Sequence, residues 1–81
     1  MGQAELVIYS TPLCAPCDVL KRILTTEGLT FEVKDLMVDE AAAELMDLHG
    51  IRSVPVLGID GELYHGDALR PERLVELLDF D

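Results

Sequence analysis

Basic residues are scarce in this 81-residue sequence. Six lysines and arginines stand against sixteen aspartates and glutamates, which gives a formal net charge of −10 at pH 7. Such an excess of negative charge repels phosphate backbones and anionic membrane surfaces. Nucleic acids and membranes are therefore not expected as partners.

Long hydrophobic runs are also missing. No apolar stretch approaches the roughly 18 residues of a membrane-spanning helix, and residues 1–5 lack the basic region of a secretory signal. Even so, 49% of the residues are hydrophobic, which is too many for a disordered chain. The sequence therefore predicts one globular domain over residues 1–81, located in the cytoplasm.

Cysteine is the third scarce residue, with only Cys14 and Cys17 present. A secreted disulfide scaffold carries several cysteine pairs spread along the chain. A bridge across two intervening residues closes almost no loop and adds little stability. This pair is therefore expected to perform chemistry, and to do so in a reducing compartment.

Hydrophobic spacing predicts strands that alternate with helices. Strands are expected at residues 6–9, 30–36, 54–57 and 62–65, with an Asp60-Gly61 hairpin turn joining the last two. Helices are expected from the cysteines to Gly28, between Asp39 and Gly50, and from Pro71 onward. The order βαβαββα indicates an α/β domain in which three helices flank a four-stranded mixed sheet.

Each element also has an expected buried face. In the second strand, Phe31 and Val33 alternate with Glu32 and Lys34, which predicts a half-buried strand. The helices are expected to bury three stripes: Leu20, Ile23 and Leu24; Ala42, Leu45, Met46 and His49; and Leu74, Leu77 and Leu78. Tyr9 either packs in the core or lines a cleft. Acidic residues such as Glu40, Glu44, Asp47, Glu72 and Glu76 are left for the outer helix faces.

The cysteines lie where the first strand gives way to the first helix. Backbone N–H groups at a helix start lack intrahelical partners and carry partial positive charge, which lowers the pKa of the Cys14 thiol. Cys14 is therefore expected to attack a target disulfide, and Cys17, one turn inside, to resolve the mixed disulfide. Pro16 costs little in a first turn, and Asp18 is interpreted as an exposed helix residue.

Zinc binding is the main chemical alternative. A structural zinc site needs four ligands, and the donors besides the cysteines are His49, His65 and carboxylates. The histidines lie outside the spacing of zinc fingers, and there is no second cysteine pair. A zinc site within one chain is therefore disfavoured.

The residues around the cysteines resemble a known superfamily. Tyr9-Ser10-Thr11-Pro12-Leu13-Cys14-Ala15-Pro16-Cys17, followed by Ser53-Val54-Pro55-Val56, is similar to the glutaredoxin-like branch of the thioredoxin-fold superfamily. The similarity extends over essentially the whole chain and implies the thioredoxin/glutaredoxin fold. It also implies a cis bond between Val54 and Pro55 beside the cysteines, where the backbone of Val54 would pair with a bound thiol substrate.

Two segments resemble the NrdH-redoxins, glutaredoxin-like proteins with thioredoxin-like activity. Gly50-Ile51-Arg52-Ser53-Val54-Pro55-Val56 is similar to their Gly-x-Arg-Gln-x-Pro-Val, and Gly66-Asp67-Ala68-Leu69-Arg70-Pro71 to their Ser-Gly-Phe-Arg-Pro, with an extra residue. The resemblance implies a monomeric thiol-disulfide oxidoreductase that takes electrons from a thioredoxin reductase. Its substrates would be protein disulfides, including that of ribonucleotide reductase, and it would bind no cofactor besides the redox-active Cys14–Cys17 disulfide.

Departures from the family patterns bear on glutathione. Ser53 replaces the usual glutamine of the NrdH-redoxins, Thr11 stands where glutathione-using glutaredoxins often carry lysine, and their Gly-Gly-x-Asp is reduced to Gly66-Asp67. Glutathione recognition is therefore expected to be weak, although Arg52 or Arg70 could supply a cation. The resemblance assigns substrate binding to Thr11, Pro12, Arg52, Ser53, Val54, Pro55, Gly66 and Asp67.

Three functions share the same cysteines. The favoured one is dithiol electron transfer, and the Ala-Pro between the cysteines is closer to the Gly-Pro of thioredoxin than to the Pro-Tyr of glutaredoxin. A potential near that of thioredoxin, about −270 mV, is therefore expected rather than about −200 to −230 mV. A glutathione-dependent glutaredoxin is the second function, and an iron–sulfur cluster shared by two chains through Cys14 is the third.

Overall fold

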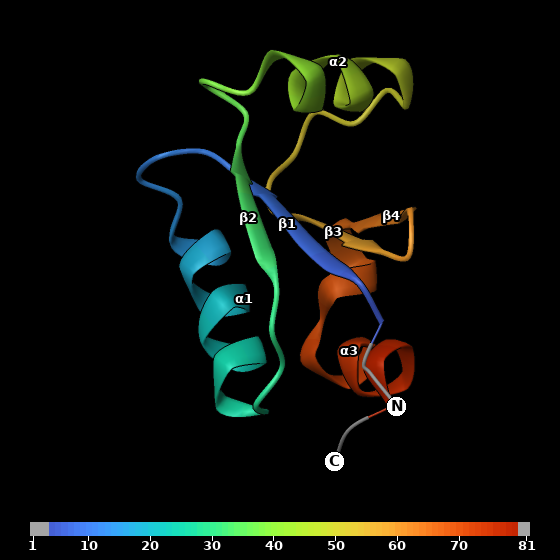
Figure 1. Ribbon diagram of the computed structural model, residues 1–81. Helices are drawn as coiled ribbons and strands as arrows, with labels where there is room; N and C mark the ends of the chain where they lie inside the picture. The colour runs from blue at the N-terminus through green and yellow to red at the C-terminus, as the bar shows by residue number, and fades with distance from the viewer. Residues whose placement is uncertain (1–3, 80–81) are drawn as a thin grey trace.

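Strands and helices follow one another in the expected order (Figure 1). The computed structural model describes residues 4–79. Its elements are β1 (Leu6–Ser10), α1 (Ala15–Thr26), β2 (Glu32–Asp35), α2 (Glu40–Leu48), β3 (Val56–Ile59), β4 (Glu62–His65), the 3-10 helix η1 (Gly66–Leu69) and α3 (Pro71–Leu78). The prediction of an α/β fold with a four-stranded mixed sheet and three α-helices is confirmed.

The sheet brings together two loops that are distant in the sequence. Its strand order is β2-β1-β3-β4, in which β1 runs parallel to β2 and antiparallel to β3. Tyr9, near the end of β1, pairs with Val56 at the start of β3. The loop that leaves β1 toward Cys14 and the loop that enters β3 through Pro55 therefore lie at the same end of the sheet.

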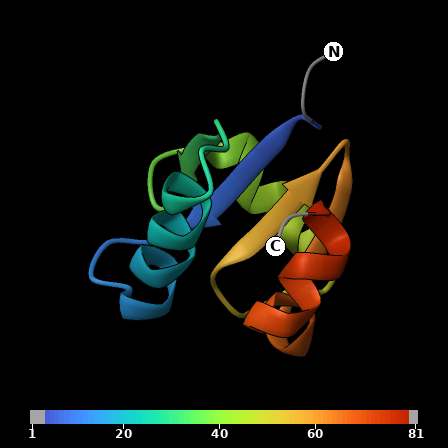
Figure 2. The ribbon, with the colours of Figure 1, turned by 90° about the horizontal axis from the view of Figure 1, so that it is seen from below.

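Helices cover both faces of the sheet. α1 and α3 lie on one face and α2 on the other (Figures 1 and 2). Alternate residues of β1 supply the two cores, because successive side chains of a strand point to opposite faces. The core beneath α1 and α3 contains Leu6, Ile8, Leu20, Leu24, Leu57 and Leu74. The core beneath α2 contains Tyr9, Ala42, Met46, Ile51 and Val56.

Local signals in the sequence explain where the elements begin and end. Asp39 caps α2, because its Oδ1 accepts a hydrogen bond from the Ala42 N–H at 3.0 Å. Gly28 follows α1 with a φ of +75°, a left-handed backbone that glycine adopts without cost. Asp60 and Gly61 both have positive φ, as the tight turn between β3 and β4 requires.

Two strands differ from their expected form. Val33 is 44% exposed rather than buried, because β2 is an edge strand with a neighbour on one side only. β3 begins at Val56, two residues later than expected, since Pro55 has no N–H to donate to a strand ladder. His49 is the C-cap residue of α2 and is exposed, so it does not extend the buried stripe of that helix.

The surface follows the expected division of charge. Each of the acidic residues assigned to the outer helix faces is exposed: Glu40, Glu44, Asp47, Glu72 and Glu76. Within residues 4–79, no helix has the length and apolar character needed to cross a bilayer.

Candidate active site

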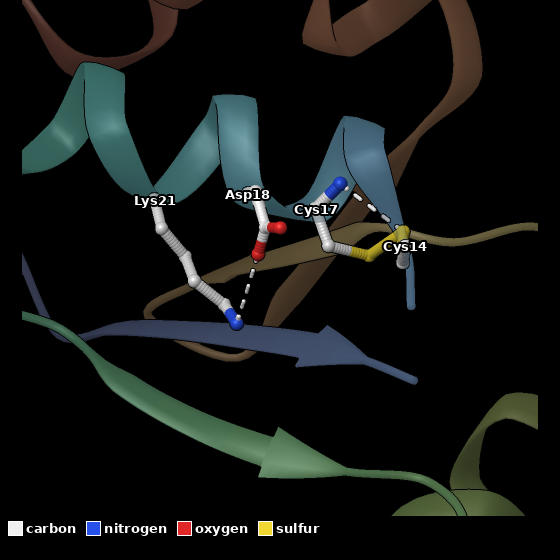
Figure 3. The surroundings of a disulfide bond; sticks show 4 residues. All are labelled: Cys14, Cys17, Asp18 and Lys21. Carbon is white, nitrogen blue, oxygen red and sulfur yellow. Dashed lines mark hydrogen bonds and ion pairs between the residues drawn. A yellow bond between two sulfur atoms is a disulfide. The ribbon is translucent and has the colours of Figure 1, made fainter. Parts of the chain in front are cut away.

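A disulfide joins Cys14 and Cys17 at the start of α1 (Figure 3). The two Cα atoms are 5.2 Å apart. Cys14 is the N-cap residue, with an extended backbone, and its Sγ accepts a hydrogen bond from the Cys17 N–H at 3.1 Å. That N–H would otherwise be one of the unpaired donors of the helix start. The helix therefore points a backbone donor at the sulfur of Cys14, as the sequence predicted.

The two cysteines differ sharply in exposure. Cys14 is half-buried, whereas Cys17 is 1% exposed. Cys17 shares the buried face of α1 with Leu20 and Leu24, which follow it at helical spacing. A molecule approaching from solvent therefore meets Cys14 and not Cys17.

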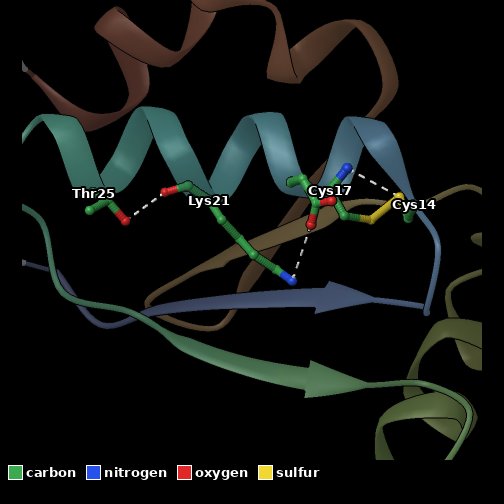
Figure 4. A network of polar contacts seen from close by, with 5 residues as sticks. Cys14, Cys17, Lys21 and Thr25 are labelled. Atoms are coloured by element: carbon green, nitrogen blue, oxygen red, sulfur yellow. Dashed lines mark hydrogen bonds and ion pairs between the residues drawn. A yellow bond between two sulfur atoms is a disulfide. The ribbon is translucent and has the colours of Figure 1, made fainter.

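Two charged residues of α1, Asp18 and Lys21, follow the disulfide along the helix. Lys21 Nζ lies 3.8 Å from Asp18 Oδ1, and Thr25 Oγ1 donates to the Lys21 carbonyl at 2.8 Å (Figures 3 and 4). The side chain of Asp18 is 69% exposed, which confirms its interpretation as a surface residue. Water screens an ion pair of this kind, so it contributes little to stability.

An apolar groove with a volume of about 590 Å³ opens beside the cysteine pair. One wall comes from α1 and the other from η1 and the start of α3. Figure 2 shows α1 and α3 on the same side of the sheet. The loop before β3 closes one side. Apolar side chains predominate: Pro16, Val19 and Ile23 from α1, then Pro55, Leu69 and Pro71. Among the described residues, Arg70 is the one charged residue in the lining.

Several of the expected substrate-binding residues meet at this groove. Ser53, Val54, Pro55 and Gly66 line it, and the Val54–Pro55 bond is cis, as the family resemblance implied. The loops at the end of the sheet thus converge on the cysteine pair. Substrate binding by these residues remains a prediction.

Four other expected residues lie outside the groove lining. Thr11 is half-buried and Pro12 exposed, both in the loop that leads to Cys14, and Arg52 is exposed before the cis bond. Asp67 forms an exposed ion pair with Arg70, 3.6 Å from its Oδ1 to the arginine Nε. Either arginine could supply a cation on the sequence alone. Arg70 lines the groove, and Arg52 does not.

The sequence reading missed part of the apolar wall. Val19 was not singled out, yet it lines the groove and is 50% exposed. Pro16, Val19 and Ile23 recur at i, i+3 and i+7, so a second apolar stripe beside the core stripe could have revealed it. Tyr9, in contrast, packs in the core beneath α2 and does not line the groove.

Tyr64, His49 and His65 do not line the groove. Tyr64 on β4 donates from its hydroxyl to Glu62 Oε2 at 2.9 Å, and this hydrogen bond raises the pKa of the tyrosine. His49 and His65 are exposed. Among the residues the structure describes, no cluster of three or more histidine, cysteine, aspartate or glutamate side chains could hold a metal ion.

This topology, with a Cys-x-x-Cys disulfide at the start of α1 and a cis-proline beside it, defines a glutaredoxin-like thiol oxidoreductase of the thioredoxin fold. The glutaredoxin family model matches residues 6–64. The chain therefore belongs to the glutaredoxin family.

Individual relatives cover nearly the whole chain. The Gene 56 protein of Mycobacterium phage L5 is 31% identical over 80 residues, which is 95% of this chain and 75% of that protein. The thioredoxin-like protein BC3987 superposes with a TM-score of 0.78 at 32% identity, over 91% of this chain and 100% of its own. The glutaredoxin-like NrdH-redoxin from Escherichia coli, a protein with a thioredoxin-like activity profile, gives 0.79 at 27% identity, over 90% and 93%.

Proposed function

We propose that this protein is an electron carrier of the NrdH-redoxin type, which reduces disulfides in other proteins. The difference in exposure between the two cysteines carries the proposal. Cys14 is half-buried at the start of α1, whereas Cys17 is 1% exposed. Cys14 can therefore attack a protein disulfide, while Cys17 stays buried until it resolves the mixed disulfide.

The reaction proceeds in two exchanges. In the reduced protein, the Cys14 thiolate attacks one sulfur of the target disulfide, and the other target sulfur leaves as a thiolate. Cys17 then loses its proton and attacks the Cys14 sulfur, so the Cys14–Cys17 disulfide forms and the second target thiolate leaves. Two electrons pass to the target, and its two thiolates take up protons.

The Cys17 N–H assists the first exchange and the later re-reduction of the disulfide. It lies 3.1 Å from Cys14 Sγ in the disulfide form. The same donor stabilises the Cys14 thiolate before attack and again when Cys14 serves as leaving group during re-reduction.

The groove favours a protein target over glutathione. Glutathione carries two carboxylates and an amine, whereas the groove is largely apolar and its single charged residue, Arg70, already faces Asp67 at 3.6 Å. A small anion would lose hydration against this lining without gaining a partner for its charge, whereas apolar side chains that flank a protein disulfide would not. The similarity to a glutaredoxin-like protein with a thioredoxin-like activity profile supports the same choice.

The proposed electron path begins at a thioredoxin reductase, in the reducing cytoplasm, and ends at a protein disulfide such as that of ribonucleotide reductase. The expected lack of a bound cofactor follows from the chemistry, because thiol-disulfide exchange needs only the two sulfurs.

A coupled assay tests the source of the electrons. The oxidised protein receives NADPH with a thioredoxin reductase, or NADPH with glutathione and glutathione reductase, and NADPH oxidation is followed in the presence of insulin. We expect the thioredoxin reductase to support a rate at least about tenfold higher, which corresponds to about 1.4 kcal/mol of preference. Reduction by the glutathione system alone would contradict the proposal and favour a glutathione-dependent glutaredoxin.

A further inference from the structure

Leu13 immediately precedes the attacking cysteine and has an unusual environment. Its relative exposure is 105%, the highest among the exposed large hydrophobic residues of positions 4–79. It belongs to neither core cluster and does not line the groove. The folded domain by itself therefore gains no burial from this leucine.

The backbone of Leu13 is also unfavourable for its residue type. Its φ is +58°, in the left-handed region, where a Cβ atom crowds the following carbonyl. It follows Pro12 within a turn, and a positive φ after proline favours glycine or asparagine. Leucine at this position is thus disfavoured by both its backbone and its exposure. Strain of this kind concentrates at functional sites.

The sequence on either side of Leu13 lacks charge. Residues 6–17 include no charged side chain, although 27% of the whole sequence is charged. Along the chain, Cys14 lies between Leu13 on one side and the groove residues Ala15 and Pro16 on the other. A protein disulfide bonded to Cys14 is therefore flanked by Leu13 on one side and on the other by a largely apolar groove, whose one charged lining residue among the described positions is Arg70.

We propose that Leu13 is a specificity-determining residue, which packs against an apolar surface beside the target disulfide of a protein substrate. This role rests on the proposed reduction of protein disulfides and concerns the same site. The left-handed turn directs the leucine outward, and the contact with the substrate buries it. A small disulfide has no such flanking surface and makes no use of the leucine.

The substitution Leu13→Asn tests this role, because asparagine is polar and tolerates a left-handed backbone. With insulin as substrate and dithiothreitol as reductant, kcat/KM is expected to fall about tenfold, as for the loss of one buried leucine contact. With bis(2-hydroxyethyl) disulfide, the rate should stay within twofold. The thermal midpoint should rise by about 4–8 °C, since the strained leucine is gone.

Two further variants serve as controls. Leu13→Met keeps an apolar side chain and should retain insulin reduction within twofold. Leu48→Asn makes the same chemical change at a leucine that is 84% exposed on α2, across the sheet from α1, and should change neither rate.

Each outcome distinguishes the role of Leu13 from the function itself. If the unsubstituted protein reduces insulin and Leu13→Asn does so equally well, the role is overturned while the proposed function stands. Equal losses on insulin and on the small disulfide also overturn it, because the leucine would then affect the cysteines rather than recognition. An unsubstituted protein that reduces no protein disulfide overturns both.

Discussion

The Cys14→Ser protein is expected to lose disulfide reductase activity by a factor of at least about 10³, because removal of a nucleophile abolishes the covalent step. A serine hydroxyl is not ionised near neutral pH and cannot form a bond to a target sulfur. The loss is measured as insulin reduction with dithiothreitol as reductant, after subtraction of the rate without protein.

The fold should survive this substitution. Cys14 is half-buried, and the bridge to Cys17 spans a sequence separation of 3, so its removal costs little stability. Thr26→Ser, at the exposed last residue of α1, is the matched control and should keep full activity. Activity of Cys14→Ser equal to that of the control would refute the assignment of Cys14 as the attacking group.

The Cys17→Ser protein is expected to stop after the first exchange. Cys14 remains accessible and forms the mixed disulfide, but no second sulfur lies beside it to release the target. A covalent 1:1 complex with the target should therefore accumulate, visible by mass spectrometry and dissociated by dithiothreitol. Turnover with NADPH and a thioredoxin reductase as the electron source, without dithiothreitol, should fall by a factor of about 10² or more.

A doubly substituted protein, Cys14→Ser with Cys17→Ser, provides the matched control and should form no complex. Two results would contradict the assigned roles. One is full turnover by Cys17→Ser, and the other is a trapped complex with Cys14→Ser, since Cys17 is 1% exposed and should not reach a protein disulfide to attack it.

Much of the fold could be predicted from the sequence because its signals are local. Asp39 lies before an apolar helical stripe and accepts the hydrogen bond of an N-cap. Asp60-Gly61 lies between two apolar runs and forms the turn of a hairpin. Each of these signals depends on a few neighbouring residues, so no knowledge of the tertiary structure is needed.

Features that depend on distant neighbours were less predictable. Val33 alternates with polar residues as a half-buried strand should, but its exposure of 44% follows from the position of β2 at the sheet edge. Strand order is a property of the whole chain and is not encoded in the alternation. The start of β3 was misplaced because apolar residues flank Pro55 on both sides.

The chemistry of the site could be predicted from the sequence, whereas its shape could be predicted only in part. The spacing of Cys14 and Cys17 at a strand-to-helix junction pointed to the pair that forms a disulfide at the start of α1. The groove could not be derived, because it requires α1 and α3, distant in the sequence, to lie on the same face of the sheet. The left-handed backbone of Leu13 was equally inaccessible, since leucine rarely adopts it.

The negative charge is unevenly distributed over the surface. Acidic side chains cover the outer faces of α2 and α3, while the groove beside the cysteines is lined mainly by apolar side chains and, among the described residues, by one arginine. The prediction from charge thus concerns polyanions and the molecule as a whole, whereas the proposed preference for protein disulfides rests on the apolar groove.

The reduction potential of the Cys14–Cys17 couple tests the central claim, that this pair supplies electrons in the manner of a thioredoxin. It is measured by equilibrating the protein in dithiothreitol buffers of defined ratio and counting free thiols. We expect a value near about −270 mV, the potential of thioredoxin. A value above about −200 mV, beyond the range of glutaredoxins, would contradict the account.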